Sequence, residues 1–249
     1  MRENLIAVVL AAGKGTRLHS DEHPAPKCMR LAAGRPLLGW VLDALDFVPR
    51  DRTVLVGGYK KEQVFGGFPD CLQAVQEPQL GTGHAVLCAE DCLKDFCGTV
   101  LVCYGDMPLL RKQTYLDLLA RHAETGAACT LLSGTTEEAL PYGRVLRDEA
   151  GDFLRVVEDR DCSTPELRAI RELNVGIYAF DCQKLLPCLH ALRADNAQKE
   201  YYLTDVPDLL RQKGERVAVH CAELGEELLG VNTPEQLAAA EACLLARRV

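Results

Sequence analysis

The chain alternates between short apolar runs and longer segments in which apolar residues recur at helical spacing. This alternation constrains the fold more than any other feature. Continuous apolar runs are typical of strands buried on both faces of a parallel sheet, and they occupy residues 4–10, 53–58, 98–105 and 127–134. Helical spacing is found over residues 36–47, 83–93 and 113–126. The alternation predicts an α/β, Rossmann-like fold with a mostly parallel central sheet and helices on both faces.

The pattern changes after Tyr142. Strand-like runs at residues 143–148, 152–159 and 172–180 are separated by turn signals such as DEAGD, which predicts an antiparallel excursion from the sheet. Helical spacing returns over residues 182–192, 202–214 and 233–248. The last segment opens with Thr233, Pro234 and Gln236, the order of a capping box with proline at the first helical position. No repeat, low-complexity tract or flexible linker interrupts the chain, so we expect a single domain over residues 1–249.

Charge and cysteine content argue against several classes of protein. The net charge is −8, and no basic stripe of the kind that tracks nucleic acid is present. No apolar run approaches the roughly 20 residues that span a membrane, and Arg2 and Glu3 precede a short strand rather than the apolar core of a signal peptide. The twelve cysteines form no C-x-x-C pair. We therefore expect a cytoplasmic protein with reduced, mostly buried thiols and neither nucleic acid nor membrane as a partner.

The stretch LAAGKGTR, residues 10–17, follows the first apolar run and has the composition of a phosphate-binding loop. It does not fit a Walker A loop, because Lys14 precedes Gly15 and position 10 is leucine. It does not fit the Rossmann glycine pattern either, because Leu18 stands at the third glycine position. Backbone amides near the glycines and the cation of Arg17 can still bind an anion. A plain glycine-rich turn remains the alternative. From this loop to residue 35 the chain has more basic than acidic residues. The acidic residues are Asp21 and Glu22, and the basic residues are Lys14, Arg17, Lys27, Arg30 and Arg35.

Three later stretches carry further candidates. In QEPQLGTGHA, Gln76 offers the donor and the acceptor that a pyrimidine edge requires, although the Gly-Thr-Gly segment is also a common helix start. Asp106 directly follows an apolar strand, where ligands of such sheets lie and where a carboxylate can hold Mg²⁺; a turn aspartate before Pro108 is the alternative. The polar stretch DNAQKEYYLTD, residues 195–205, can serve a sugar or a helix cap.

Taken in order, these stretches resemble one family. LAAGKGTR with a downstream PK, then QLGTGHA, YGDMPLL, YGRV, VVEDRD, ELNVGIY, NAQKEYYLTD and GVNTPEQLAAAE are similar to the nucleotidyltransferase family of sugar-1-phosphate uridylyltransferases. The similarity is to the N-terminal uridyltransferase (pyrophosphorylase) domain of the bifunctional N-acetylglucosamine-1-phosphate uridyltransferases. It covers about residues 6–242.

The resemblance implies a role for each matching residue. The catalytic cations would be Arg17 and Lys27, meeting the phosphates, and the Mg²⁺ ligands would be Asp106 and Asn232. The nucleotide would be bound by Leu10, Ala11, Ala12, Gly13, Gln76, Gly81, Thr82, Tyr104 and Gly105, with Gln76, Gly81 and Thr82 reading uracil. The sugar would be bound by Gly143, Glu158 and Asn174. The implied substrates are UTP and N-acetylglucosamine-1-phosphate, and the implied products are UDP-N-acetylglucosamine and pyrophosphate.

The implied chemistry agrees with these residue types. Attack by the sugar phosphate oxygen on the α-phosphate of UTP needs no side-chain nucleophile, so alignment and charge neutralisation suffice. We expect Lys27, Arg17 and Mg²⁺ to supply the neutralisation. The division implied is a nucleotide-binding part over about 1–130, a sugar-binding part over about 131–230 and a C-terminal helix over 234–246.

Three departures from the family pattern bear on these expectations. The loop LHSDEHPAP between Arg17 and Lys27 is longer than usual, which leaves Lys27 and Arg30 as competing phosphate contacts. Val175 stands where a threonine is expected, removing a hydroxyl near the sugar. The chain ends at Val249 without hexapeptide repeats, so we expect no acetyltransferase β-helix domain and a monomer or weak dimer. Alternatives to the favoured activity are a uridylyl- or thymidylyltransferase for another sugar-1-phosphate and a catalytically silent nucleotide-sugar binding protein.

Overall fold

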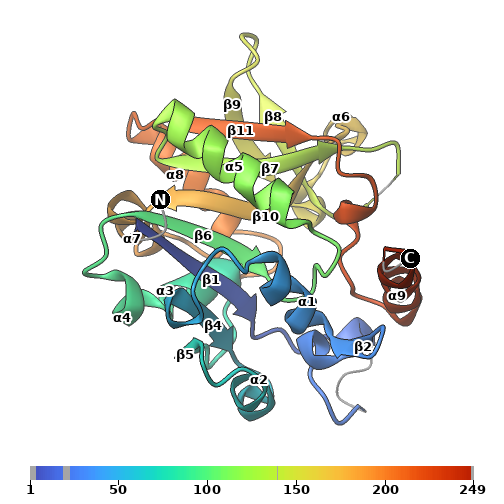
Figure 1. Ribbon diagram of the computed structural model, residues 1–249. Helices are drawn as coiled ribbons and strands as arrows, with labels where there is room; N and C mark the ends of the chain where they lie inside the picture. Colours follow the sequence, from blue (N-terminus) through green and yellow to red (C-terminus); the bar gives the residue numbers. More distant parts are fainter. Residues whose placement is uncertain (1–3, 19–22, 139, 248–249) are drawn as a thin grey trace.

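A computed structural model describes residues 4–18, 23–138 and 140–247. A nine-stranded mixed sheet forms its centre (Figure 1), with strand order β11-β7-β10-β6-β1-β4-β5 and with β8 and β9 off this path. The strands in this path are β1 Leu5–Ala11, β4 Thr53–Gly57, β5 Leu72–Val75, β6 Thr99–Tyr104, β7 Cys129–Thr135, β10 Glu172–Asp181 and β11 Val217–Ala222. The pairs β1–β4, β1–β6, β4–β5 and β7–β11 are parallel. The α/β fold expected from the sequence is therefore confirmed.

Strand β1 shows how an unbroken apolar run serves both faces of the sheet. All of its residues are buried. Side chains of successive residues point to opposite faces, and accordingly Ile6, Val8 and Leu10 belong to one buried cluster while Leu5, Ala7, Val9 and Ala11 belong to another. The two clusters are the two layers of core on either side of the sheet.

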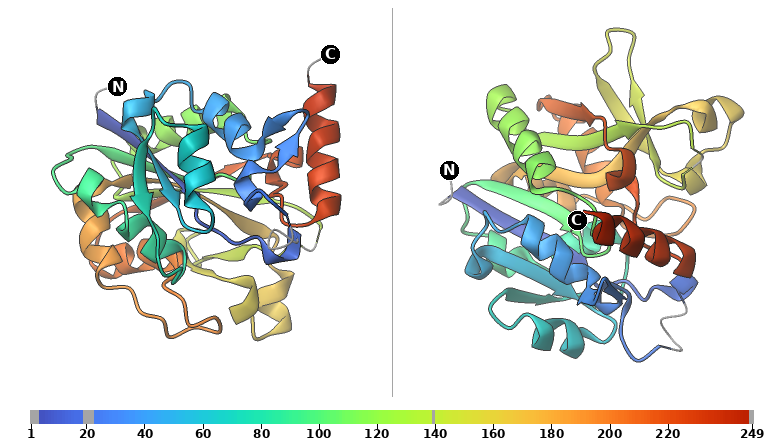
Figure 2. Two further views of the ribbon diagram at one scale, coloured as in Figure 1. Left: turned by 90° about the horizontal axis from the view of Figure 1, so that it is seen from below. Right: turned by 45° about the vertical axis from the view of Figure 1, so that its right-hand side comes forward.

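Helices cover both of these layers (Figures 1 and 2). Residues of α1 Leu37–Ala44, α2 Lys61–Gly67 and α5 Lys112–Thr125 pack into the cluster that contains Val9. Residues of α3 Thr82–Leu87, α4 Glu90–Leu93, α7 Cys182–Leu189 and α8 Val206–Gln212 pack into the cluster that contains Val8. The helix expected over 113–126 ends as the sequence predicts, with Gly126 in the left-handed conformation as its C-cap.

The single helix expected over residues 83–93 is not what the structure shows. The structure divides this segment into α3 and α4, with Cys88 as the C-cap of the first and Ala89 as the N-cap of the second. Ala89 is buried and packs in the core together with Leu93. The apolar spacing of this segment is helical, but it belongs to two short helices rather than to one.

The antiparallel excursion comprises β8 Gly143–Arg147 and β9 Phe153–Val157, which pair with each other, followed by α6 Pro165–Ala169. The third run of the excursion, β10, returns to the main sheet and lies between β6 and β7, antiparallel to both. Because β10 runs against its neighbours, its first residues lie at the edge where the parallel strands end. This places residues 172–176 beside the carboxyl ends of β6 and β7.

The C-terminal helix α9, Pro234–Ala246, crosses back to the beginning of the chain and packs on the small hairpin of β2 Leu31–Ala32 and β3 Arg35–Pro36 (Figure 2). The capping box that the sequence predicts is present, with Thr233 as N-cap. Glu241 Oε1 accepts a 2.8 Å hydrogen bond from the amide of Ala33. A third buried cluster fills this contact with Leu18, Ala32, Leu37, Leu109, Val231, Ala240 and Leu244.

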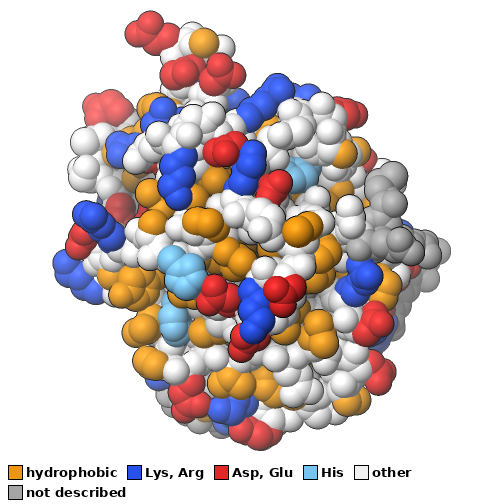
Figure 3. Space-filling model, turned by 90° about the vertical axis from the view of Figure 1, so that its left-hand side faces the viewer, with side chains coloured by type: hydrophobic (Ala, Val, Ile, Leu, Met, Phe, Trp, Pro, Cys, Tyr) orange, Lys and Arg blue, Asp and Glu red, His pale blue; other side chains and the backbone are white. Residues whose placement is uncertain are grey.

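The surface carries mixed charge on the face shown in Figure 3, where Lys and Arg side chains are scattered among acidic and apolar ones. The twelve cysteines are all free thiols, and most of them are buried. Within the described part of the chain, no helix combines the length and the apolar character that a membrane crossing requires.

Candidate active site

Two adjoining cavities lie at the carboxyl ends of β1 and β6. One, of about 450 Å³, is lined by the loop after β1 together with Lys27, Gln76 and Gly81. The other, of about 550 Å³, is lined by Arg17, Gly143, Glu158, Asn174 and Asn232. The residues common to both cavities are Thr82, Tyr104, Asp106 and Glu200. The site thus consists of two compartments whose shared wall includes Asp106.

Asp106, Lys27 and Asn232 form the polar centre of this wall. Asp106 follows β6, and Asn232 precedes α9. The ammonium of Lys27 forms an ion pair with the carboxylate of Asp106 and donates a 2.7 Å hydrogen bond to Asn232 Oδ1. The backbone carbonyl of Asp106 also accepts a 2.9 Å hydrogen bond from the amide of Val231. Two oxygens from distant parts of the chain therefore face one cation position.

The other basic residues of the first 35 positions divide between the site and the surface. Arg17 Nη2 lies 3.5 Å from Asn232 Oδ1, and Lys14 lines the smaller cavity. Arg30 instead donates to the carbonyl of Leu18 at 3.1 Å, and Arg35 pairs with Asp43. Of the two residues that the sequence left open as phosphate contacts, Lys27 lines the smaller cavity, and Arg30 lines neither of the two cavities. Asp21 and Glu22 lie outside the described residues.

Gln76 and the segment 80–83 form the far wall of the smaller cavity. The Gln76 side chain is buried, and its Nε2 donates a 2.8 Å hydrogen bond to the carbonyl of Gly81. Two backbone hydrogen bonds of 2.8 Å, from Tyr201 N to Leu80 O and from Gly83 N to Tyr201 O, dock this segment onto the segment before α8. Gly81 has φ +112°, and a Cβ there would lie 2.6 Å from the carbonyl oxygen of Tyr201. The close approach therefore requires glycine.

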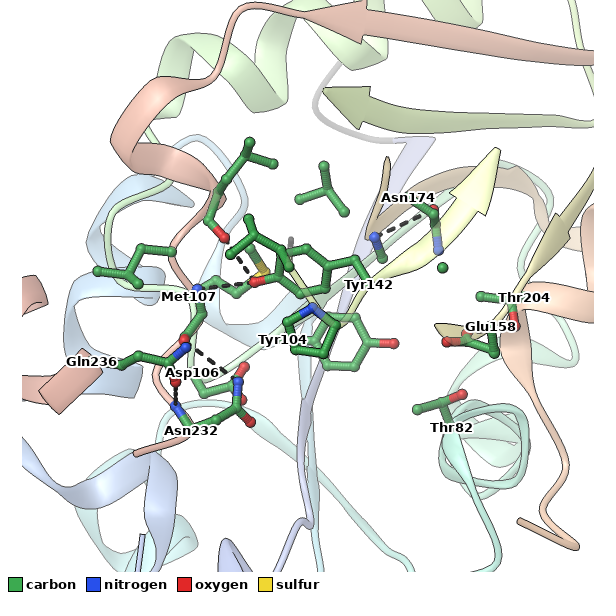
Figure 4. Close-up of a pocket in the computed structure, with 18 of the residues that line it drawn as sticks. Thr82, Tyr104, Asp106, Met107, Tyr142, Glu158, Asn174, Thr204, Asn232 and Gln236 are labelled. Carbon is green, nitrogen blue, oxygen red and sulfur yellow. Dashed lines mark hydrogen bonds between the residues drawn. The ribbon is translucent and has the colours of Figure 1, made fainter. Parts of the chain in front are cut away.

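Glu158, Thr204 and Asn174 lie at the other end of the larger cavity (Figure 4). Thr204 Oγ1 donates a 2.8 Å hydrogen bond to Glu158 Oε1. Burial raises the pKa of Glu158, and the hydrogen bond from Thr204 opposes this rise. The Nδ2 of Asn174 donates a 2.7 Å hydrogen bond to the hydroxyl of Tyr178. Figure 4 places Asp106, Asn232 and Gln236 on the opposite side, with Tyr104 in between.

Residues 7–203 match the model of the MobA-like NTP transferase domain. The chain belongs to this family. Three relatives named bifunctional protein GlmU show the extent of the similarity. The relative from Pelobacter propionicus is 46% identical over 250 residues, covering 99% of this chain and 53% of the relative. The relative from Brevibacillus brevis is 44% identical, covering 97% and 52%, and that from Corynebacterium aurimucosum is 44% identical, covering 99% and 51%. The chain spans about half the length of these relatives.

Within this NTP transferase domain, nearly all residues expected at the site line one of the two cavities. Gly105 lines neither cavity, and its amide donates a 3.0 Å hydrogen bond to the carbonyl of Leu10. This hydrogen bond joins the segment after β6 to the end of β1. Val175 is buried in the cluster that contains Val9, along with Ile177. Val175 also lines the larger cavity, so the exchange changes the wall of that cavity as well as the packing of the core.

Several residues at the site were not assigned from the sequence. The Tyr142 hydroxyl donates to Leu228 O at 2.7 Å and accepts from Gly230 N at 3.0 Å, which ties the excursion to the segment before Asn232. Glu200 lines both cavities. Both residues lie in motifs that carry the family resemblance, YGRV and NAQKEYYLTD. Sequence alone did not separate them from their neighbours, because it does not show which side chain points into the site.

Proposed function

We propose that this domain transfers UMP from UTP to N-acetylglucosamine-1-phosphate, giving UDP-N-acetylglucosamine and pyrophosphate. The observation that carries the proposal is the pair of cavities meeting at Asp106, since a transfer between two phosphorylated substrates needs two compartments and a shared cation site. The order of motifs along the chain and the family membership support the same activity.

The smaller cavity would hold the nucleotide. The backbone of the loop after β1, Leu10 to Gly13, would line it. Gln76, Gly81 and Thr82 would contact uracil from the far wall. Tyr104 would lie beside the α-phosphate at the junction of the two cavities. This arrangement would leave the α-phosphate facing the larger cavity.

The larger cavity would hold the sugar phosphate. Glu158 would accept hydrogen bonds from sugar hydroxyls, with Thr204 holding its carboxylate in place. Gly143 adjoins this carboxylate, because a Cβ at Gly143 would lie 3.6 Å from Glu158 Oε2 and 2.7 Å from a methyl group of Val156. The glycine keeps this wall open for the sugar. Asn174 would complete the contacts from β10.

The residues at the cation position fit Mg²⁺. One carboxylate and one amide oxygen suit an ion that keeps several waters and takes phosphate oxygens as further ligands, and a cationic ammonium already lies between them. Asp106 and Asn232 would hold the metal, which would neutralise phosphate charge and polarise the α-phosphoryl group. No group of three or more His, Cys, Asp or Glu suited to a metal is found in residues 4–18, 23–138 and 140–247.

The reaction would proceed by in-line displacement. An oxygen of the sugar phosphate forms a bond to the α-phosphorus, and the bond from that phosphorus to the bridging oxygen of pyrophosphate breaks. The chain contributes position and positive charge: Lys27 and Arg17 would stabilise the charge on the transferred and departing phosphates. The proposed nucleotide part over about 1–130 and sugar part over about 131–230 would meet at this bond, with the helix over 234–246 supporting Asn232.

The test is a pyrophosphate-release assay with a panel of substrates. UTP, dTTP and CTP are each combined with N-acetylglucosamine-1-phosphate, glucose-1-phosphate and galactose-1-phosphate, with Mg²⁺ or with a chelator. We expect the highest kcat/KM for UTP with N-acetylglucosamine-1-phosphate. With the chelator we expect no pyrophosphate release. Turnover with glucose-1-phosphate in its place would refute the sugar assignment, and a preference for dTTP would refute the nucleotide assignment.

A further inference from the structure

His84 contacts the candidate base-reading residue but does not line either cavity. It lies in α3, and its Nδ1 is 3.2 Å from Nε2 of Gln76. The same Nε2 donates to the carbonyl of Gly81 at 2.8 Å. Gln76 therefore makes two contacts on its nitrogen side, one to backbone and one to the imidazole.

These contacts define which atom of the Gln76 amide is which. A backbone carbonyl only accepts hydrogen bonds, so the amide atom facing Gly81 must be the nitrogen. Its second hydrogen then points to His84, whose Nδ1 must accept and whose proton resides on Nε2. Burial lowers the pKa of His84, in agreement with a neutral ring that can accept.

The remaining polar atom of the amide, Oε1 of Gln76, is an acceptor, and Gln76 lines the smaller cavity. Uracil carries a proton on N3 and can donate to such an atom. Cytosine has an unprotonated N3, and the lone pair of this N3 would repel the lone pair of Gln76 Oε1. With the amide held in this orientation, a uracil and a cytosine in the cavity would differ by a hydrogen bond rather than by size, and a hydrogen bond gives the stronger discrimination.

We propose that His84 is a positioning residue that fixes the amide of Gln76, so that the cavity selects uracil nucleotides over cytosine nucleotides. The proposal rests on the proposed function, in that it takes the smaller cavity to be the nucleotide compartment. Gly81 holds the same orientation from the backbone, and His84 provides its second anchor. The contribution of His84 is that of one amide hydrogen bond.

Cys88 offers a matched control. Its Sγ lies 3.8 Å and 3.9 Å from the two ring nitrogens of His84, so it packs against the same ring without contacting Gln76. A variant at Cys88 disturbs the packing of the imidazole, whereas a variant at His84 removes the acceptor. Only the second should change base selection.

The experiment measures equilibrium binding of UTP and of CTP to the whole chain by calorimetry. His84→Phe keeps an aromatic ring but has no nitrogen acceptor. His84→Ala is used if the His84→Phe protein does not fold. His84→Asn restores an acceptor near the position of Nδ1. We expect the ratio of CTP to UTP dissociation constants to fall by roughly fivefold in His84→Phe and His84→Ala, the worth of a typical amide hydrogen bond. In His84→Asn and Cys88→Ala the ratio should stay within about twofold of the wild type, well inside the value of one such bond.

Two results would overturn the inference: a wild-type chain that binds UTP and CTP equally, or folded His84→Phe and His84→Ala variants that keep the wild-type ratio. Pyrophosphate release measured on the same samples separates this inference from the proposed function. If the ratio depends on His84 while no sugar-1-phosphate supports turnover, the proposed function fails and the role of His84 stands.

Discussion

The Lys27 side chain occupies the position where charge is most concentrated in the site. Its ammonium contacts both Asp106 and Asn232, and Arg17 contacts the same Oδ1 atom of Asn232 at 3.5 Å. The two oxygens cannot bind an ammonium and a metal ion at one position, because two cations would then coincide. Metal binding therefore requires Lys27 to move, and the phosphates of a bound nucleotide are the nearest proposed partners for the released ammonium.

Among the residues of the candidate site, loss of the Asp106 carboxylate should reduce the catalytic rate most. Asp106→Asn keeps the shape and an oxygen but removes the charge, so we expect kcat to fall by on the order of a hundredfold or more, as for loss of a key electrostatic contact. The fold should be retained, because the carbonyl of Asp106, not its side chain, bonds to Val231. Steady-state rates and far-UV circular dichroism measure the two effects. A folded variant with an unchanged rate and unchanged Mg²⁺ dependence would show that the metal ligands are elsewhere.

Lys27→Met tests the competition between the ammonium and the metal. Removing the ammonium leaves Asp106 and Asn232 free to face a cation, so the affinity for Mg²⁺ without nucleotide should rise by about tenfold, or ~1.4 kcal/mol. The rate should fall, because a phosphate contact is lost. Arg30→Met is the control, since Arg30 bonds to the carbonyl of Leu18 and not to the site. Weaker or unchanged Mg²⁺ binding, measured by calorimetry, would mean that the two cations do not share the position.

At the scale of elements, helix α9 positions a candidate metal ligand through its own cap. Gln236 Oε1 accepts hydrogen bonds from the amides of Asn232 at 2.8 Å and Thr233 at 3.1 Å. The capping box thus fixes the backbone of the residue whose side chain faces Lys27. A feature that begins the helix also orders the site.

Gln236→Ala should therefore change both stability and metal use. We expect a loss of about 1 kcal/mol in the free energy of unfolding and a several-fold rise in the Mg²⁺ concentration for half-maximal rate, on the scale of one lost hydrogen bond. Thr164→Ala removes the side-chain cap of α6, where Thr164 accepts from the amide of Leu167. It should lower stability by a similar amount and leave the Mg²⁺ requirement unchanged. If the rate depends on Mg²⁺ concentration in the same way in both variants, the prediction is wrong, and the cap of α9 does not order the candidate metal site.

The elements that could be predicted from the sequence are those with strong local signals. The start of α9 and the end of α5 were located by capping residues and by Gly126. The edge strands β5 and β11 and helix α2 were not predicted. β5 is four residues long with three of them exposed, and β11 is mostly half-buried, so neither has a continuous apolar run. Their pairing with neighbours in the sheet decides their structure.

The candidate site was predictable only in part, for a similar reason. Asp106 was recognised from the strand before it, and Asn232 from the family resemblance. Their common contact with Lys27 joins positions 205 residues apart in the chain, which only the tertiary fold reveals. Which of Lys27 and Arg30 lies at the candidate site likewise depends on where each side chain points. Local sequence indicates candidate residues, and the sheet topology brings them together.

For the whole molecule, the antiparallel insertion of β10 brings residues from both chain directions to one edge of the sheet. The parallel strands β1 and β6 end at the site, and β10 begins there. Asn174 thus enters from the opposite chain direction, beside Tyr104 in the larger cavity. A sheet with only parallel strands would present only strand ends at this edge. The mixed sheet thus supplies the start of β10 to the wall of the larger cavity, which is the proposed sugar compartment.

The stability of the whole chain should depend on pH through the carboxyl group of Asp205, which directly precedes α8. Burial, followed by repulsion from Asp161 and Asp208, raises the pKa of Asp205 to about 6, against about 3.9 in an unfolded chain. The native state therefore binds this proton more tightly than the unfolded state. Its contribution to stability is fully present below about pH 4 and is lost as the pH rises through about 6.

Asp205→Asn should remove this loss, because a neutral amide has no charge to bury. Asp205 makes no side-chain cap hydrogen bond at the start of α8, so little else should change. With allowance for its partial exposure to solvent, we expect a gain of about 1 kcal/mol at pH 7.5, or roughly 2–4 °C in Tm, and a smaller gain at pH 4.5. Asp70→Asn, at an exposed aspartate before β5, should give no such difference between the two pH values. Thermal unfolding at both pH values decides the point: an equal gain at pH 4.5 and 7.5, or a loss at pH 7.5, would show that the charge on Asp205 does not oppose folding.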